Sequence, residues 1–290
     1  MLEWSTDYFQ QKGIPNPRLD SELLLAHVLR CRRIDLYIQF DRPLSSQELD
    51  QYRELVRARL QRQPVAYILQ ETEFWSLPLT VRPGCLVPRQ DTETLVELAL
   101  KVIGDMREAF PTDEQLRVVE LGVGSGAIPL AVCSEAEGIW WAATDISPLA
   151  LSVANENRAR HQKLLEPRSN KLHLLQARDL EGFSSTFRPH LVISNPPYIA
   201  SADIDGLEPE VAMAEPRVAL DGGPDGLDPH RTLLDFASRQ LVAGGHVMLE
   251  IGFDQGPSAK KLVEETPGLQ FVEVHKDYAG NDRVLHALKP

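Results

Sequence analysis

Between residues 118 and 126 a short apolar segment, VVEL, runs directly into a turn with glycine at every second position. Gly122, Gly124 and Gly126 carry no Cβ atom, so they allow the chain to turn sharply and to approach a ligand closely. A helix-compatible sequence follows, and its start would supply free backbone N–H groups to the same place. The pattern predicts a buried strand, a ligand-binding turn at its carboxyl end, and a helix.

Strand and helix patterns continue to alternate after this turn. Helices are expected between the strands, including one that begins at Pro148 behind a capping Ser147 and one over 229–241. This alternation predicts an α/β fold with a doubly wound, mainly parallel sheet and helices on both faces. The expected strands are 118–121, 139–144, 172–176, 191–194, 246–251, 271–275 and 284–288.

The beginning of the chain has a different pattern and predicts a small helical domain. Leucines recur at helical spacing over 17–60, where glycine is absent. One helix is expected with Asp20 or Ser21 as its cap, and a second from 45–46, where Glu48 completes a capping box. Four arginines on or beside the second helix are interpreted as a solvated face, with a partner contact as the alternative: Arg53, Arg57, Arg59 and Arg62.

Residues 70–88 alternate between apolar and polar on either side of an expected turn, which predicts a β-hairpin connector. A helix should then begin near Asp91 or Thr92 and end at about Gly104. The expected organisation is therefore a helical domain over 1–69, the connector over 70–88 and an α/β domain over 89–290.

Charge and cysteine content argue against several classes of protein. The 290 residues include 42 Asp and Glu against 30 Lys and Arg, and a net charge of −12 disfavours a nucleic-acid backbone as the main partner. Cys31, Cys85 and Cys133 lie far apart without CxxC spacing, so neither a disulfide framework nor a zinc site is expected. No basic segment precedes an apolar run of secretory or membrane-spanning length, so we expect a cytoplasmic protein without membrane contact.

A second polar element, Asn195-Pro196-Pro197-Tyr198, directly follows the expected strand 191–194. The two prolines fix φ and keep Asn195 out of helical geometry, so the polar groups are held in place. Unlike a carboxylate or histidine, an Asn carbonyl and a backbone carbonyl next to proline can only accept hydrogen bonds, which suits a planar N–H substrate. Asn-Pro and Pro-Pro are also ordinary loop sequences, but the glycine-rich turn at the same edge of the sheet favours a functional site.

Two acidic residues follow neighbouring strands and suggest a nucleoside-containing cofactor. Asp145 lies about twenty residues beyond the glycines, as expected of an acid that binds ribose hydroxyls, although it could simply begin a helix. Asp179 is placed to accept a hydrogen bond from an adenine amino group, with Leu180 packing on the ring; the alternative is an acid of a surface loop. The glycines also fit a dinucleotide site, but residues 195–198 lack the proton acceptor of a dehydrogenase and suit methyl transfer from a sulfonium to nitrogen.

The chain resembles the class I S-adenosylmethionine-dependent methyltransferases, specifically the protein-(glutamine-N5) methyltransferases of peptide chain release factors, the PrmC/HemK family. The resemblance covers nearly the whole chain, with Gln90 and Pro129 as departures from the usual pattern. Its motifs are RLDSELLLAH at 18–27, LVPRQDTE at 86–93, ELGVGSGAI at 120–128, NPPYI at 195–199, EPRVAL at 215–220, DGL at 225–227 and AGNDRV at 279–284.

The resemblance implies a seven-stranded sheet whose last strand is antiparallel, and an N-terminal domain for substrate recognition. It also implies methylation of the Gln in a Gly-Gly-Gln loop of a release factor. S-adenosyl-L-methionine would then bind with its ribose at Asp145 and its adenine beside Asp179 and Leu180, while Asn195 and the Pro196 carbonyl accept the two amide hydrogens. The methionine part of the cofactor would lie against Gly122, Val123, Gly124, Ser125 and Gly126, with Asn195 also near the cofactor; the substrate would contact Asn195, Pro196, Pro197 and Tyr198.

Alternatives remain open from the sequence. The same tetrapeptide suits N6-adenine methylation of nucleic acid, and the chain could also be an NAD(P)-dependent oxidoreductase or a cofactor-binding regulator without turnover. We favour the release-factor enzyme, acting as a monomer without direct nucleic-acid contact. Residues 199–228 fit either a flexible flap around the substrate or a structured surface loop.

Overall fold

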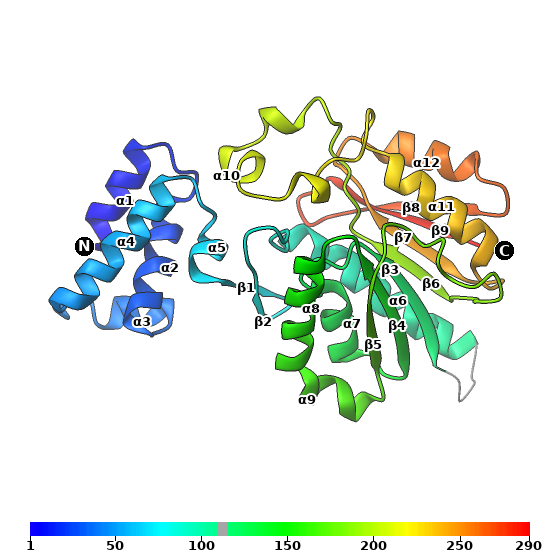
Figure 1. Cartoon of the computed structure of the whole chain (residues 1–290), viewed down its shortest axis with the longest axis horizontal. Helices are drawn as coiled ribbons and strands as arrows, with labels where there is room; N and C mark the ends of the chain where they lie inside the picture. The colour runs from blue at the N-terminus through cyan, green and yellow to red at the C-terminus, as the bar shows by residue number, and fades with distance from the viewer. Residues whose placement is uncertain (110–114) are drawn as a thin grey trace. The chain divides into compact units, whose positions relative to one another are not determined.

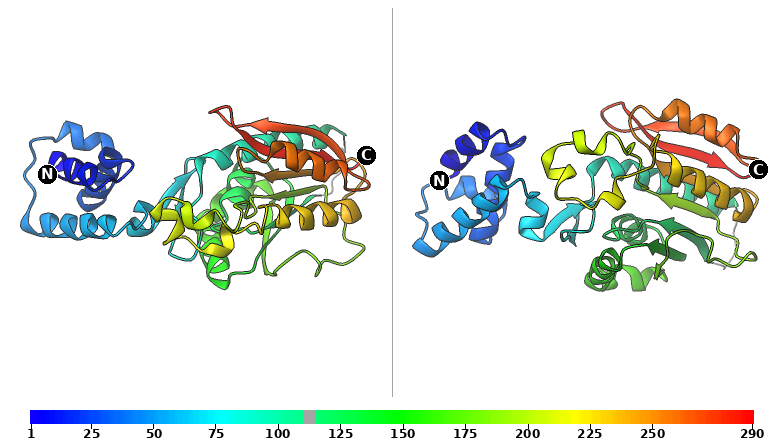
Figure 2. Two further views of the ribbon diagram at one scale, coloured as in Figure 1. Left: turned by 90° about the horizontal axis from the view of Figure 1, so that it is seen from above. Right: turned by 45° about the horizontal axis from the view of Figure 1, so that its top comes forward.

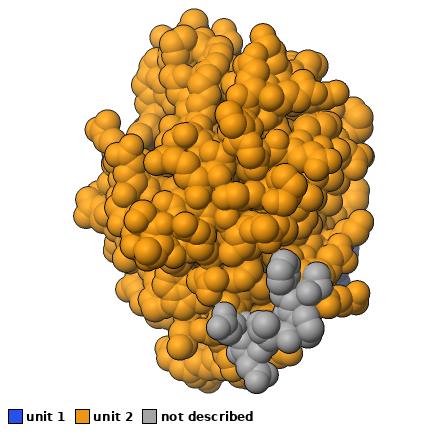
Figure 3. All heavy atoms as spheres, turned by 90° about the vertical axis from the view of Figure 1, so that its right-hand side faces the viewer, with its two compact units in different colours: residues 1–71, 208–214 blue, residues 72–207, 215–290 orange. Residues whose placement is uncertain are grey.

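The structure is a computed structural model, and it describes residues 1–109 and 115–290. Its contacts divide the chain into two compact units, coloured separately in Figure 3. The first contains residues 1–71 and 208–214, and the second contains residues 72–207 and 215–290. The first unit therefore includes a short piece of chain from far along the sequence. None of the helices described is both long and apolar enough to cross a membrane.

The first unit is helical. Its helix α4 begins behind Ser45, whose Oγ accepts from the Glu48 N–H at 3.2 Å while the Glu48 carboxylate accepts from the Ser45 N–H at 2.8 Å, which confirms the capping box. Helix α2 begins at Pro17 with Asn16 in the N-cap position and no side-chain capping bond, so the expectation of a cap at Asp20 or Ser21 was wrong. The helices are α1 (Leu2–Gln11), α2 (Pro17–Leu29), α3 (Arg33–Ile38), α4 (Ser46–Leu60), α5 (Val65–Leu69) and α10 (Pro209–Ala212).

A buried group of ionic side chains ties α10 to the other helices of this unit. Arg59 is only 4% exposed; its Nε donates to Asp20 at 2.7 Å and its Nη1 donates to Glu210 at 2.8 Å. Arg62 also donates to Glu210, at 3.2 Å. The expectation that Arg59 lies on a solvated face was therefore wrong, because its charge is paired inside the unit.

The second unit is built on a seven-stranded sheet with the order β5-β4-β3-β6-β7-β9-β8, in which β9 runs antiparallel to both neighbours. This confirms the predicted α/β sheet and the antiparallel last strand. A separate two-stranded hairpin pairs β1 (Glu71–Phe74) with β2 (Leu77–Thr80). The seven strands are β3 (Leu116–Leu121), β4 (Ile139–Asp145), β5 (Lys171–Gln176), β6 (Leu191–Ser194), β7 (His246–Glu250), β8 (Gln270–Lys276) and β9 (Asp282–Leu288).

Helices cover both faces of this sheet (Figures 1 and 2). Val118 packs in the core formed with α6, α7 and α8, whereas its neighbour Val119 packs in the core formed with α11 and α12. Strands buried on both faces explain the nearly continuous apolar runs in the sequence. The helices are α6 (Glu93–Ala109), α7 (Ala127–Glu135), α8 (Pro148–Arg160), α9 (Gln162–Leu165), α11 (Asp228–Gln240) and α12 (Gly256–Glu264).

Local sequence accounts for where several of these helices begin. Helix α8 starts at Pro148, and the Ser147 Oγ accepts a hydrogen bond from the Ala150 N–H, as predicted. A short 3-10 turn (Gln90–Thr92) leads into α6, which was expected to end near Gly104 but continues to Ala109. Glycine inside a helix lowers its stability without stopping it when neighbouring side chains pack well.

Candidate functional site

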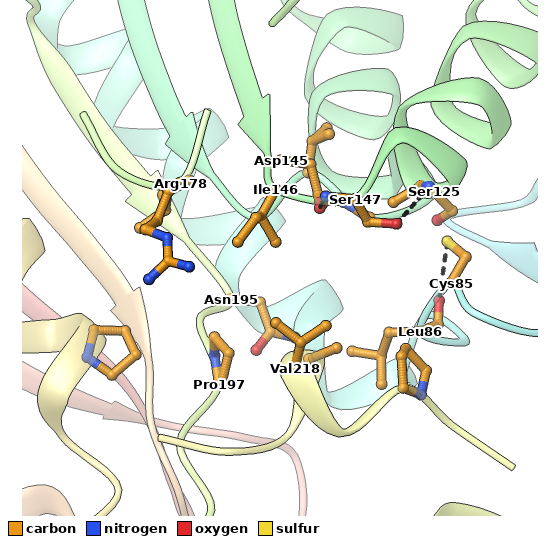
Figure 4. A pocket seen from close by; sticks show the side chains of 18 of the residues that line it. Cys85, Leu86, Ser125, Asp145, Ile146, Ser147, Arg178, Asn195, Pro197 and Val218 are labelled. Atoms are coloured by element: carbon orange, nitrogen blue, oxygen red, sulfur yellow. Dashed lines mark hydrogen bonds between the residues drawn. The ribbon is translucent and has the colours of Figure 1, made fainter. Parts of the chain in front are cut away.

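A cavity of about 650 Å³ opens where the parallel strands of the second unit end. Residues in the loops that follow β3, β4, β5 and β6 all contribute to its walls (Figure 4). Its volume lies within the range of small-molecule sites, which is roughly 300–1,000 Å³. Carboxyl ends of parallel strands are the usual place for ligands in such sheets.

The glycine-rich turn forms one wall. Gly122, Gly124 and Gly126 have φ values of +75°, +54° and +83°, a region that other residues rarely adopt. A Cβ atom at Gly122 or Gly124 would meet no atom within 4 Å, so the space beside the turn is open. Val123 and Ser125 also line the cavity. The wall can therefore receive a ligand against its backbone.

Asp145 ends β4 and holds the turn in place. Its Oδ2 accepts from the Gly124 N–H at 2.9 Å, and its Oδ1 accepts from the Ser147 N–H at 2.8 Å. Burial raises the pKa of this carboxyl, and the backbone hydrogen bonds oppose the rise. Each carboxylate oxygen has a second lone pair, so Asp145 can still accept hydrogen bonds from ligand hydroxyls.

The neighbourhood of Asp179 differs in part from expectation. Asp179 lines the cavity together with Arg178 and Glu181. Leu180 is 2% exposed and packs in the core beneath α11 and α12, so its side chain is not part of the cavity wall. The apolar side chain of Ile146 does line the cavity, and Figure 4 shows it beside Asp145. Ile146 was missed because a single apolar residue after a strand carries no distinctive sequence signal.

The tetrapeptide at 195–198 presents only part of itself to the cavity. Asn195 and Pro197 line the wall, whereas Pro196 and Tyr198 are not among the lining residues. The Asn195 Nδ2 donates to the Thr92 Oγ1 at 3.0 Å, which leaves its Oδ1 as the acceptor that can serve a ligand. The Tyr198 hydroxyl donates to Glu250 Oε1 at 3.3 Å, and burial raises the pKa of this phenol.

Two side chains behind Asn195 were not singled out from the sequence. Thr92, in the turn before α6, lines the cavity and accepts the Asn195 hydrogen bond. Glu250, the last residue of β7, is fully buried, and this burial raises its pKa to about 7. Glu250 could have been found from the sequence, because a charged residue at the end of an expected buried strand is unusual.

Part of the segment 199–228 is structured and forms another wall. Pro216, Val218, Ala219 and Asp221 line the cavity, and Asp221 pairs with Ile199 through an isolated β-bridge. Figure 4 shows the Val218 side chain among those that line the cavity with Asn195. Pro216, Val218 and Ala219 give this wall an apolar surface, and Asp221 adds a carboxylate to it.

The described residues contain no cluster of three or more His, Cys, Asp or Glu side chains that could hold a metal ion. Besides backbone N–H groups and the neutral Asn195 amide, the cavity lining carries the charged side chains of Asp145, Arg178, Asp179, Glu181, Asp221 and Asp228.

Comparisons with known proteins show which family the chain resembles over nearly its whole length. Residues 1–69 match the family model of the PrmC N-terminal domain. A release factor glutamine methyltransferase of Geobacter sulfurreducens is 36% identical, covering 98% of this chain and 94% of the relative. One of Rhodopirellula baltica is 36% identical over 100% of this chain and 95% of the relative. The human MTRF1L release factor glutamine methyltransferase is 35% identical, covering 97% of this chain and 84% of the relative.

Solved structures show the same fold at low sequence identity. The hMettl16 catalytic domain in complex with MAT2A 3'UTR hairpin 1 has a TM-score of 0.54 and 12% identity, covering 81% of this chain and 80% of that one. A second complex of this domain, with hairpin 6, has a TM-score of 0.52 and 14% identity, covering 73% of this chain and 75% of that one. At such identity the likeness concerns only the fold.

Proposed function

Because the chain belongs to the family of the release factor glutamine methyltransferases, we propose roles in that reaction for several groups of the cavity. The enzyme transfers a methyl group to the side-chain amide nitrogen of the Gln in the Gly-Gly-Gln motif of a peptide chain release factor. One observation carries the proposal: Asn195 and the glycine-rich turn line the same cavity, and the Asn195 Oδ1 is a neutral hydrogen-bond acceptor. A neutral acceptor can hold an amide N–H without removing its proton.

The cavity fits S-adenosyl-L-methionine, which supplies an electrophilic methyl group on a sulfonium. We assign its methionine part to the open backbone of Gly122 and Gly124, where a Cβ would find empty space. Asp145 has acceptor capacity left for the ribose hydroxyls. Asp179 serves the adenine amino group, and Ile146 replaces Leu180 as the apolar side chain available to the ring.

Asn195 and Pro196 orient the substrate. An amide nitrogen is a poor nucleophile because its lone pair is delocalised, so positioning must supply much of the rate. Asn195 Oδ1, on the cavity wall, and the backbone carbonyl of Pro196, a residue beside that wall in the chain but not among those lining it, accept the two amide hydrogens and aim the nitrogen at the methyl carbon. With S-adenosylmethionine bound, the N–C bond would form as the C–S bond breaks with its electron pair left on sulfur, and the proton released from the nitrogen would pass to water. Positive charge grows on the nitrogen during this step, so both acceptors bind more strongly in the transition state.

Pro197 and Tyr198 have supporting roles in this proposal. Pro197 packs beside the substrate amide as part of the cavity wall. Tyr198 does not line the cavity; its hydroxyl donates to Glu250, and this hydrogen bond holds the loop 195–198 in place. The helical region 1–69 recognises the release factor, the hairpin region 70–88 connects it, region 89–290 carries out the transfer, and the enzyme acts as a monomer in the cytoplasm.

N6-adenine methylation of nucleic acid is the alternative, and it is not favoured. The relatives that match nearly the whole chain are named as release factor enzymes. The net charge of −12 also opposes approach of a phosphate backbone.

A methyl-transfer assay tests the proposal. The enzyme receives S-adenosylmethionine with a labelled methyl group and, separately, an intact release factor, the same factor with the motif Gln replaced by Ala, DNA and RNA. We expect label only in the intact factor, located on the Gln side chain by mass spectrometry. Label that enters nucleic acid alone would overturn the assignment. Calorimetry with S-adenosylmethionine and NAD tests the cofactor separately.

A further inference from the structure

We propose that Gln255, at the start of α12, is a positioning residue for methyl transfer, because it holds the end of the loop 195–198 through the carbonyl oxygen of Tyr198. The inference rests on the proposed function, in which the Pro196 carbonyl, two residues earlier, accepts an amide hydrogen of the substrate. Neither Gln255 nor Tyr198 lines the cavity, so Gln255 acts through the loop and does not touch the substrate.

The loop has few groups by which it can be held, because Pro196 and Pro197 have no N–H. Its first end is fixed by β6, where Ser194 pairs with Leu249 of β7 and the Ser194 Oγ donates to the Leu121 carbonyl oxygen at 2.6 Å. Beyond that point the two prolines fix φ but leave ψ free. The direction of the Pro196 carbonyl therefore depends also on how the other end of the loop is held.

That other end is held by a side chain. The Gln255 Nε2 donates to the Tyr198 carbonyl oxygen at 2.9 Å. The N–H of the same peptide group, which belongs to Ile199, donates to the Leu220 carbonyl oxygen at 3.0 Å. This peptide group therefore has a partner on each side, and without the bond to Gln255 it could turn about the bond that remains.

The Gln255 amide is oriented by backbone on both sides. Its Oε1 accepts from the Gly252 N–H at 2.8 Å, and the Gln255 N–H donates to the Gly252 carbonyl oxygen at 3.0 Å. An amide oxygen accepts and an amide NH₂ donates, so the Gly252 N–H and the Tyr198 carbonyl together permit one orientation of the side chain. Although Gln255 is in the N-cap position of α12, its side chain makes no capping bond to that helix. The side chain therefore serves the contact with Tyr198.

The glycine in the DGL motif at 225–227 makes room for this contact. Gly226 has a φ of +75°, and a Cβ atom there would lie 2.3 Å from the Tyr198 carbonyl oxygen and 2.7 Å from the Gln255 Nε2. Only a glycine lets the backbone pass so close. The Gly226 carbonyl oxygen lies 3.4 Å from the same Nε2, so this contact is weaker than the bond to Tyr198 at 2.9 Å. The bond to Tyr198 is thus the main one that Gln255 donates.

Two variants, Gln255→Glu and Gln255→Ala, test the inference. Gln255→Glu keeps the size of the side chain and an acceptor for Gly252, but its ionised carboxylate cannot donate to Tyr198. Gln255→Ala removes both bonds and lets water reach the Tyr198 carbonyl. The matched control is Gln240→Glu, because Gln240 is also half-buried, accepts from Arg188 at 2.8 Å, and lies at the opposite end of α11 from the end that lines the cavity.

The kinetic constants separate positioning from general damage. At about pH 8 we expect Gln255→Glu to lower kcat by about 10-fold or more and Gln255→Ala by about 3-fold, with the control unchanged, because small errors in position are costly in this kind of reaction. KM and calorimetric affinity for S-adenosylmethionine should stay near the wild-type values, since Gln255 does not line the cavity. General damage would instead lower the melting temperature and the cofactor affinity together with kcat.

Lowering the pH should rescue Gln255→Glu. A protonated carboxyl resembles the amide, because its C=O accepts from Gly252 while its O–H donates to Tyr198. Burial and the facing carbonyl favour this neutral form, so the ratio of variant to wild-type kcat should rise about 3-fold or more between about pH 8 and about pH 6. The ratio cancels the titration of groups present in both proteins. On the segments around Gln255 these are Tyr198, Asp225, Asp228, Glu250, Asp254 and Asp282.

Failure of this inference differs from failure of the proposed function. If the wild type methylates no release factor, the proposed function is wrong. If it does, but Gln255→Glu equals it at pH 8, or the ratio of the two kcat values does not change with pH, then Gln255 does not position the loop. Thermal melting identifies misfolded protein. If Gln255→Glu does not fold, Gln255→Ala decides, and an unchanged kcat in that variant overturns the inference.

Discussion

Replacing Asn157 by alanine should destabilise the second unit by about 3 kcal/mol. Asn157 is fully buried in α8, and its side chain makes three hydrogen bonds to backbone. Its Nδ2 donates to the carbonyl oxygens of Thr80 and Ser125, both at 2.9 Å, and its Oδ1 accepts from the Thr80 N–H at 2.7 Å. Each such bond contributes about 1 kcal/mol net, and the loss leaves three backbone groups without this partner. Ser125 belongs to the glycine-rich turn, so cofactor affinity should fall as well.

The measurement is urea unfolding followed by tryptophan fluorescence, since Trp75, Trp140 and Trp141 all lie in the second unit. With an m value of about 3 kcal/mol per M, the midpoint should fall by roughly 1 M. Asn155→Ala is the matched control, because Asn155 is an exposed asparagine of the same helix and should change stability by less than about 0.5 kcal/mol. If the two variants unfold at the same urea concentration, Asn157 does not hold the hairpin and the turn together as argued.

Three further predictions concern other parts of the chain. Asn195→Ala should lower kcat by about 10²- to 10³-fold while cofactor affinity by calorimetry stays nearly the same, because one acceptor of the transition state is lost; equal turnover would contradict its assignment. Glu210→Ala should destabilise the first unit by about 3 kcal/mol in thermal unfolding, because Arg59 stays buried with one carboxylate fewer; an unchanged transition would show that the pairing is not stabilising. Burial raises the pKa of Glu120 from its ordinary value of 4.5 to about 8. Between these two pH values Glu120 keeps its proton in the folded state but has lost it in the unfolded state, so the free energy of unfolding should fall as pH rises through this range. Glu120→Gln, which can still accept the hydrogen bond from Trp141 Nε1, should remove this fall in urea titrations at several pH values; a fall of the same size would mean that Glu120 is not its source.

Features set by local sequence could be predicted. The seven strands follow from apolar runs, and the positive φ values of the turn follow from glycines at alternate positions. The capping box at Ser45 follows from a serine and a glutamate three positions apart. Asn195 stood out because two prolines restrict the backbone around it.

Features set by distant contacts could not be predicted. Arg59 reads as part of a charged helix face, and its burial is explained by pairing with two distant carboxylates, Asp20 at 39 and Glu210 at 151 positions away. Leu180 reads as a candidate for the cavity, but the direction of a side chain after a strand depends on how the next helix packs. The bond between Thr92 and Asn195 spans 103 positions and has no local signature.

The helical unit is not one continuous stretch of chain, and this limits how it can be separated or exchanged. A protease cut after residue 71 would release helices that lack Glu210, leaving Arg59 with Asp20 as its remaining carboxylate partner among those described. The freed fragment should therefore melt at a lower temperature than the same helices in the intact enzyme. A chimaera that borrows the N-terminal region of a relative would need the donor's residues equivalent to 208–214 as well.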